Sequence, residues 1–218
     1  MIDPKSTNPE PRGPSPPPSV LLAVSGGVAS GKSTVAAMLA GPQGVVLSAD
    51  EAAHAILTLP ETLAWLVETF GPQALDRAGQ ADRKFLANHI FRDPDLRKRL
   101  EDWIHPRVRA RIWADLAEAR ASDIPRIVLD IPLLLESDGL AELREQIDHL
   151  VFVEVPDGER DRRARAQRGW APGEVARREA AQMPLSNKKD VSDAVLQAGD
   201  SLEQLAINVQ ELLTRLGC

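Results

Sequence analysis

The feature that most constrains the fold of this chain is the segment Gly26–Ser33, which reads G-G-V-A-S-G-K-S and fits the pattern G-x-x-x-x-G-K-[ST] in full. An apolar run, Val20–Val24, precedes it, and Val35–Leu39 follows with helical spacing. This order predicts a strand, a tight loop and a helix, the context that a phosphate-binding loop requires. The glycines let successive N–H groups point at phosphate oxygens, and the positive end of the following helix adds to the attraction.

The loop predicts an ATP site that uses Mg²⁺ as cofactor. Lys32 is expected to reach the β and γ phosphates, and Ser33 to ligate the metal. The residues predicted to bind the nucleotide are Gly27, Val28, Ala29, Ser30, Gly31, Lys32, Ser33 and Thr34. A chance match in a chain of this size occurs roughly once in a hundred or more rarely. A dinucleotide-binding turn is excluded, because the chain has no G-x-G-x-x-G spacing.

Apolar runs alternating with helical patterns predict an α/β fold of the P-loop kind, with a parallel sheet between two layers of helices. Further strands are expected at Val45–Leu47, Ile127–Asp130, Leu150–Val153 and Ala194–Leu196, and helices at Leu57–Phe70, Arg83–Phe91, Leu96–Ile104, Val108–Ala119 and about Leu202–Leu216. A crossover needs only one helix. The four helices at about 60–120 therefore predict an inserted subdomain that binds a ligand, with Trp65, Trp103 and Trp113 in its core rather than stacked on a base.

Composition limits the partners and the compartment. The net charge of −6 argues against a general nucleic-acid binder. No apolar run approaches about 18 residues, so no membrane-spanning helix is expected. Residues 1–19 are Pro-rich without a signal-peptide core and are predicted to be a disordered leader to a domain at 20–218. The only cysteine, Cys218, cannot form an intramolecular disulfide, which favours a reducing compartment such as the cytoplasm.

Two aspartates follow predicted strands at the edge where the loop opens. Asp50 comes just after the second strand, where a carboxylate can hold an acceptor hydroxyl, take its proton or support the metal. It also precedes Glu51 in a way that suits a helix N-cap, and its position alone leaves both roles open. Asp130 closes the third strand like a Walker-B acid and is expected to assist Mg²⁺ through water.

The segment Glu159–Arg168 holds five arginines and allows two interpretations. A surface helix would pair them with Asp157, Glu159 and Asp161. A kinase lid, predicted over about 157–190, would close over ATP and bring guanidinium groups to the transferring phosphoryl group. The neighbouring Gly169 and Gly173 favour the lid.

Two short matches to switch GTPases lack the required context. Asn187–Asp190 fits N-K-x-D, and Asp76–Gly79 fits D-x-x-G, yet neither follows a predicted strand. Both segments are predicted to be solvated charges at turns.

With these residues in place, the chain resembles the dephospho-coenzyme A kinase family over nearly all of residues 20–216. The matching stretches are Ser25–Thr34, Ala49-Asp50, Phe70-Gly71, Asp82-Arg83 with Leu86, Ile90-Phe91, Leu100-Glu101, Ile104–Pro106 and Ile131–Glu136. The His-Pro and Pro-Leu-Leu-x-Glu elements, in this order after a P-loop, separate this family from other small kinases.

The resemblance implies a three-part kinase that transfers the γ-phosphoryl group of ATP to the ribose 3′-hydroxyl of dephospho-coenzyme A, the final step of coenzyme A synthesis. It implies catalytic roles for Asp50, Lys32 and Arg168. The implied substrate-side residues are Asp50, Arg83, His105, Arg109, Pro132, Leu133 and Glu136. The expected partners are these two small molecules, with no nucleic acid and no membrane, and the protein is expected to be a monomer or a weak homo-oligomer.

The chain departs from the family pattern in three places. Ser48 stands where the family often has a second Asp, and the lid is one residue shorter, which leaves the phosphate-contacting arginine open among Arg163, Arg165 and Arg168. Gln197–Gly199 replaces Asn-x-Gly, which leaves the adenine contacts open. A kinase for a nucleoside or another small metabolite, and a nucleotide-dependent switch, remain the rival functions.

Overall fold

The computed structural model describes residues 19–199 and 201–218. The predicted Pro-rich leader at 1–19 lies outside the described residues, apart from Ser19. The strands are β1 (Val20–Gly26), β2 (Val45–Ser48), β3 (Arg126–Asp130), β4 (His149–Glu154) and β5 (Ala194–Gln197). The α-helices are α1 (Lys32–Ala40), α2 (Ala49–Leu57), α3 (Pro60–Phe70), α4 (Arg83–Arg92), α5 (Pro94–Ala121), α6 (Ala141–Arg144), α7 (Asp157–Arg168), α8 (Glu174–Glu179), α9 (Leu185–Asp190) and α10 (Leu202–Leu216), and short 3₁₀ turns lie at Pro72–Ala74 and Asp138–Leu140.

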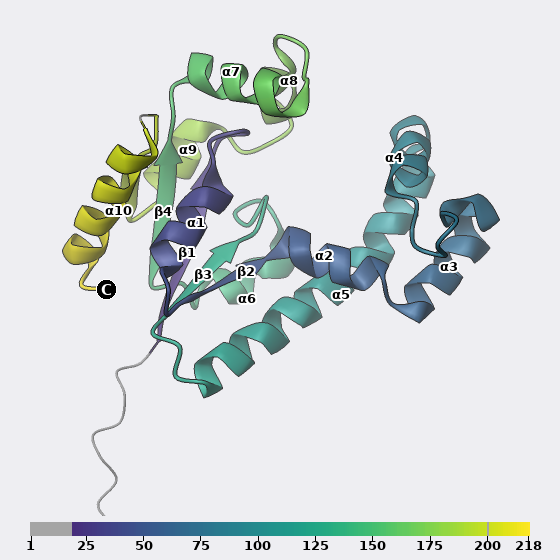
Figure 1. Ribbon diagram of the computed structural model, residues 1–218, viewed down its shortest axis with the longest axis horizontal. Helices are drawn as coiled ribbons and strands as arrows, with labels where there is room; N and C mark the ends of the chain where they lie inside the picture. The colour runs from purple at the N-terminus through teal and green to yellow at the C-terminus, as the bar shows by residue number, and fades with distance from the viewer. Residues whose placement is uncertain (1–18, 200) are drawn as a thin grey trace, which may run out of the picture.

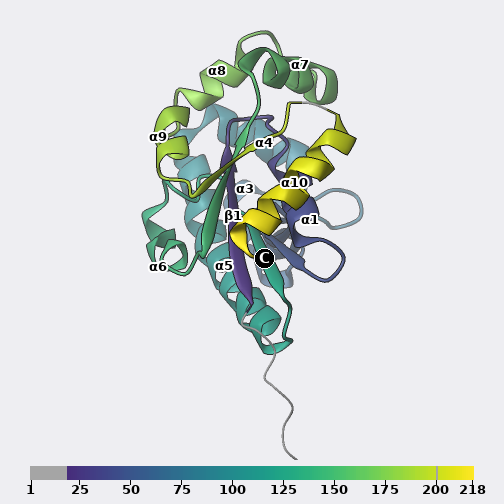
Figure 2. The ribbon, with the colours of Figure 1, turned by 90° about the vertical axis from the view of Figure 1, so that its left-hand side faces the viewer.

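The strands form one parallel sheet in the order β2-β3-β1-β4-β5. Alternate residues of β1 face opposite layers, as the period of two in a strand requires. Leu22 and Val24 pack with residues of α1 and α10, whereas Leu21 and Ala23 pack with residues of α5 and α6. Figure 2 shows α1 and α10 on one side of β1, with α5 and α6 on the other. The predicted three-layer α/β fold is confirmed.

The parallel register brings the ends of three strands to one edge. β1 runs into the phosphate-binding loop, and Ser48 at the end of β2 is the register partner of Asp130 at the end of β3. Ligands of open α/β sheets bind outside the carboxyl ends of the strands. This edge therefore carries the candidate site.

Helix α2 was not among the helices predicted from apolar spacing, although an N-cap at Asp50 was one of the alternatives. The side chain of Ser48 caps it by accepting a hydrogen bond from the Glu51 amide at 3.3 Å. The alternative role of Asp50 as the N-cap is therefore wrong, since Asp50 lies in the first turn of the helix. Pro60 occupies the first turn of α3, where its missing N–H costs nothing, and it separates the two helices.

The two helices predicted on either side of Pro106 are a single helix, α5. A proline inside a helix costs about 3 kcal/mol. Packing at both ends outweighs this cost, because Trp103 stacks on Trp65 in the helical insert and Ile112 is buried under the sheet. The side chain of Arg107 adds a hydrogen bond to the Trp103 carbonyl at 2.9 Å, next to the interruption.

The helical insert has a small core of its own. The rings of Trp65 and Trp103 lie 4.7 Å apart and nearly parallel, and Leu66 and Leu86 are buried. Trp113, predicted to belong to this core, packs instead against the sheet. Figure 1 shows α3 and α4 standing apart from the sheet, connected to it by α2 and α5.

Among the described residues, no helix combines the length and the apolar character needed to cross a membrane.

Candidate active site

A cavity of about 390 Å³ opens at the carboxyl edge of the sheet. The residues that line it come from the phosphate-binding loop, the start of α2, the end of β3 and the segment that follows, α7 and the α8–α9 region. Of the predicted site residues, the cavity brings together Val28, Ala29, Ser30, Gly31, Lys32, Ser33, Thr34, Asp50, Asp130, Pro132, Leu133, Glu136 and Arg168. Gly27 lines a separate hollow behind the loop.

The loop has the backbone shape of an anion cradle. Ala29 and Gly31 adopt left-handed conformations, with φ of 59° and 84°. Helix α1 begins at Lys32, and the first N–H groups of a helix have no partner within it. The hydroxyl of Ser30 is buried and has no hydrogen-bond partner in the structure. Open donors around a concave loop at a helix N-terminus suit phosphate oxygens.

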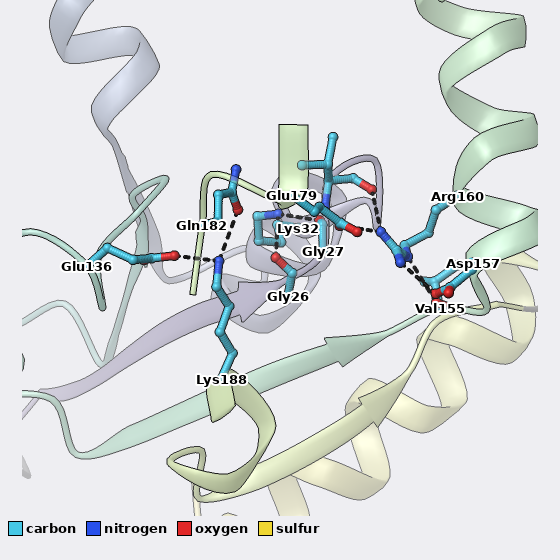
Figure 3. A network of polar contacts seen from close by, with 11 residues as sticks. Gly26, Gly27, Lys32, Glu136, Val155, Asp157, Arg160, Glu179, Gln182 and Lys188 are labelled. Atoms are coloured by element: carbon cyan, nitrogen blue, oxygen red, sulfur yellow. Dashed lines mark hydrogen bonds and ion pairs between the residues drawn. The ribbon is translucent and has the colours of Figure 1, made fainter. Parts of the chain in front are cut away.

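The side chain of Lys32 is folded back onto the phosphate-binding loop. Its Nζ donates to the carbonyl of Gly27 at 2.7 Å and to that of Gly26 at 3.2 Å (Figure 3). Burial lowers the pKa of Lys32 to about 8, and the nearby Asp130 carboxylate opposes this shift. Bound phosphates would favour the charged ammonium, so the site is electrostatically suited to an anion.

Two carboxylates line the cavity with the loop: Asp130 ends β3, and Asp50 lies in the first turn of α2, just after β2. Asp130 is buried, with 8% of its surface exposed, and Asp50 is exposed. Ser33 and Asp130 line the same cavity and offer the hard oxygen ligands that Mg²⁺ prefers. Within residues 19–199 and 201–218, no group of three or more His, Cys, Asp or Glu could hold a metal alone. Mg²⁺ usually takes few protein ligands and completes its shell with phosphate and water oxygens, so these residues fit it.

Lys188 belongs to the cavity, although the sequence placed it among solvated charges. It is 4% exposed on α9, and its Nζ lies 2.7 Å from Oε1 of Glu136 and 3.0 Å from Oε1 of Gln182 (Figure 3). The predicted turn at 187–190 is therefore wrong, because these residues end a helix. The GTPase interpretation still fails, since the motif does not follow a strand. The sequence alone could not distinguish Lys188 from Lys189. Only the fold places Lys188 against Gln182 and Glu136.

The arginine-rich helix α7 carries exposed ion pairs and also borders the cavity. Arg162 makes an exposed pair with Glu159, as a surface helix would. Arg168, at the end of α7, lines the cavity and lies over the ring of Trp170, 4.9 Å from its centroid. Arg163 instead lines a second cavity of about 500 Å³, where its Nη2 donates to the Ala198 carbonyl at 3.0 Å. Of the three candidate arginines, Arg168 is the one that reaches the phosphate-side cavity.

The remaining predicted substrate residues lie away from this cavity. Arg83 and His105 line a mostly apolar hollow of about 260 Å³ in the helical insert. Nη1 of Arg83 lies 3.4 Å from Nδ1 of His54. Arg109 packs so closely on Gly139 that a Cβ there would lie 2.9 Å from Nη1. The structure thus separates a phosphate-side cavity from a hollow in the insert.

Comparisons with known proteins agree on one family. The family model described as Dephospho-CoA kinase matches residues 20–204. A Dephospho-CoA kinase of Symbiobacterium thermophilum is 37% identical over 192 residues, covering 87% of this chain and 78% of that protein. One from Geobacillus kaustophilus is 35% identical over 187 residues, covering 85% of this chain and 91% of that protein.

Solved structures give the same fold. The crystal structure of TT1252 from Thermus thermophilus superposes with a TM-score of 0.71 at 34% identity, covering 92% of this chain and 99% of the other. The Dephospho-CoA kinase from Campylobacter jejuni has a TM-score of 0.65 at 22% identity, covering 91% of this chain and 97% of the other. At that identity the second likeness concerns the fold alone.

Proposed function

The chain belongs to the Dephospho-CoA kinase family, and from this premise we propose that it transfers the γ-phosphoryl group of ATP to the ribose 3′-hydroxyl of dephospho-coenzyme A. The observation that carries the residue-level proposal is the meeting of the loop, Asp50, Asp130 and Arg168 around one cavity. In-line phosphoryl transfer needs positioning and charge stabilisation more than covalent chemistry, and this set of groups supplies both.

The loop holds the donor in this proposal. The amides of the loop and of the first turn of α1 bind the phosphates, and the Lys32 ammonium turns from the loop carbonyls toward the β and γ groups. The cavity of about 500 Å³ beside the loop, lined in part by Thr34, Arg163, Gly199 and Leu202, takes the nucleoside end. Its position between α7 and the start of α10 supports this role.

Ser33 and Asp130 are the residues that would hold Mg²⁺, Ser33 directly and Asp130 through water. The ion, when bound, supplies positive charge that neutralises the phosphate oxygens. The protein's contribution is to keep the Asp130 carboxylate buried beside the loop, where its negative charge also favours the protonated form of Lys32.

Asp50 acts on the acceptor. Its carboxylate orients the 3′-hydroxyl and takes its proton as the hydroxyl oxygen attacks the γ phosphorus, while the bond from that phosphorus to the β–γ bridging oxygen breaks and ADP leaves. Pro132, Leu133 and Glu136 form the wall beside it and border the acceptor sugar. The apolar hollow in the insert, with Arg83 and His105 at its rim, receives the remote part of the coenzyme.

Helices α7, α8 and α9, within about 157–190, form the lid. Arg168 is exposed at the end of α7 and points to the phosphate-side cavity, so a small movement of this helix brings its guanidinium to the transferring group. There it neutralises the charge that develops on the equatorial oxygens. We place the enzyme in the cytoplasm with ATP and dephospho-coenzyme A as its partners, which its lone cysteine supports.

The test is a coupled assay of ADP release against a panel of acceptors: dephospho-coenzyme A, nucleosides and small hydroxylated metabolites, each with ATP or GTP. We expect selective turnover of dephospho-coenzyme A with ATP. Turnover of another acceptor, with none of dephospho-coenzyme A, would overturn the proposed acceptor. GTP preference without any phosphorylated acceptor would favour a nucleotide-dependent switch instead.

A further inference from the structure

A buried ion pair joins the proposed lid to the phosphate-binding loop. Arg160, on α7, is 2% exposed and pairs with Glu179 at the end of α8 (Figure 3). Oε1 of Glu179 accepts a hydrogen bond from the Val28 amide at 2.7 Å, and Nη1 of Arg160 donates to the Val28 carbonyl at 3.3 Å. The backbone N–H and C=O of Val28 are thus both hydrogen-bonded to side chains more than 130 positions away in the sequence.

The guanidinium group that anchors this contact is itself fixed on every side. Nε of Arg160 donates to the Val155 carbonyl at 3.3 Å, and Nη2 donates to Oδ1 of Asp157 at 2.6 Å. The side chain of Asp157 is 93% exposed, whereas that of Glu179 is 16% exposed. Because ion pairs are stronger where water is excluded, Glu179 is the carboxylate that holds the buried face of the arginine.

The pair lies behind the loop rather than in the phosphate cavity. Neither Arg160 nor Glu179 lines that cavity, and Arg160 borders the hollow on the opposite side together with Gly27. A Cβ on Gly27 would lie 2.5 Å from Nη1 of Arg160 and 2.7 Å from Oε1 of Glu179. The two side chains therefore shape the loop from outside and leave its inner face open to phosphates.

We propose that Arg160 and Glu179 are positioning residues that fix the conformation of the phosphate-binding loop at Gly27 and Val28. Because Glu179 belongs to α8, the loop keeps this conformation only while α8 is packed against it. The inference deepens the proposed function, on which it rests only for the statement that this loop binds the nucleotide. A loop that is held in shape before binding loses less conformational entropy when phosphate arrives. The hydrogen bond to Val28 is charge-assisted, which makes it stronger than an amide–amide bond.

The test measures ADP affinity by calorimetry and amide hydrogen exchange over residues 27–30, in the full chain and without any acceptor. We expect Glu179→Ala to weaken ADP binding about tenfold and to speed exchange at the Val28 amide. Glu179→Gln keeps an acceptor oxygen but not the charge, so its loss of affinity should be smaller, about threefold. Glu174→Ala is the matched control, because Glu174 lies on the same helix and pairs only with Arg177 and Arg178 in the structure.

Two results would overturn the inference. One is a Glu179→Ala protein that melts at a lower temperature but retains the ADP affinity and the loop exchange of the unmodified chain, which would make the pair merely structural. The other is an equal loss of ADP affinity in Glu174→Ala, which would point to general loosening of the helix. Since ADP binding is measured without acceptor, a wrong acceptor assignment leaves this test intact.

Discussion

The Nζ of Lys188 on α9 lies 2.7 Å from Oε1 of Glu136, in the segment that follows β3. The Met183 amide donates to the same carboxylate oxygen at 3.2 Å, so Glu136 connects the segment between α8 and α9 to the segment after β3. The lysine side chain is 5% exposed and that of Glu136 is 20% exposed. This pair makes a second link, besides that of Glu179 with Val28, between the proposed lid and the body of the site.

The first prediction concerns the stability of this link. Glu136→Ala leaves a buried ammonium group with Gln182 as its remaining polar partner, and we expect the free energy of unfolding to fall by about 3 kcal/mol. Urea denaturation measures it. Lys189→Ala is the control, because Lys189 pairs with Glu154 while 43% exposed and should cost less than about 1 kcal/mol. Equal costs for both variants would contradict the burial argument.

The second prediction tests the role of Asp50. Asp50→Asn keeps the size of the side chain but removes the proton acceptor, so kcat should fall by about 10²- to 10⁴-fold. The dissociation constant of ATP should change little, because the proposed partner of Asp50 is the acceptor hydroxyl and not the phosphates. Steady-state kinetics and ATP titration on the same preparation check both parts. Near-normal turnover would remove Asp50 from the mechanism.

The third prediction is a pH dependence of nucleotide binding. The pKa of Lys32 in the free protein is about 8, below its ordinary value of 10.5, chiefly because of burial. Bound phosphates stabilise the ammonium, so the complex retains the proton to a higher pH than the free protein does. ADP affinity should therefore be constant well below pH 8 and fall by up to about tenfold per pH unit above it.

Lys32→Met is the control for this pH dependence. The variant should bind ADP more weakly at pH 7, since the ammonium is gone, and its affinity should no longer fall between pH 8 and 9. Calorimetric titration over this pH range measures both effects. A slope that persists in the variant would assign the titration to another group.

The fourth prediction uses the glycine behind the loop. Gly27→Ala places a methyl group 2.5 Å from Nη1 of Arg160, whose guanidinium is held on every side. We expect ADP affinity to fall about tenfold or more. Introduced into the Glu179→Ala background, the same change should cost less, because the contact that it disrupts is already gone. Additive losses in the double variant would show that the methyl group acts elsewhere.

Gly158→Ala is a suitable comparison for that experiment. Gly158 lies on α7, two residues before Arg160, and a Cβ there would meet nothing within 4 Å. Alanine also has the higher helix propensity, by roughly 0.8–1 kcal/mol in a helix interior. Its ADP affinity should match that of the unmodified chain, and its melting temperature should be equal or slightly higher.

Residues whose positions in the fold follow from local pattern were predictable. The loop lies between an apolar run and a helical pattern, so Lys32 and Ser33 could be placed on it from the sequence. Asp50 and Asp130 follow strands, and parallel strands bring their carboxyl ends to one edge, where both now line the cavity with the loop. Arg168 also lies where a lid arginine was expected, though the sequence did not distinguish it from Arg163 or Arg165.

Local pattern misled at two positions where distant packing decides the outcome. Pro106 carries a strong helix-stop signal, yet α5 continues through it because its two halves pack against different cores. Lys188 and Lys189 look alike in the sequence, but one is buried against Glu136 and the other is exposed beside Glu154. No short window of residues contains the partners that make this difference.

The sequence by itself determined the α/β alternation, the phosphate-binding loop and the carboxylates at the sheet edge, because each depends on periodicity or on spacing within a few residues. Only the tertiary structure decided that Arg160 and Glu179 contact the loop from behind and that Arg168 lines the cavity beside the loop. Val28 lies 132 positions from Arg160 and 151 positions from Glu179 in the sequence. Such contacts exist only once the sheet and both cores have formed, so physical proximity, and not sequence order, selects them.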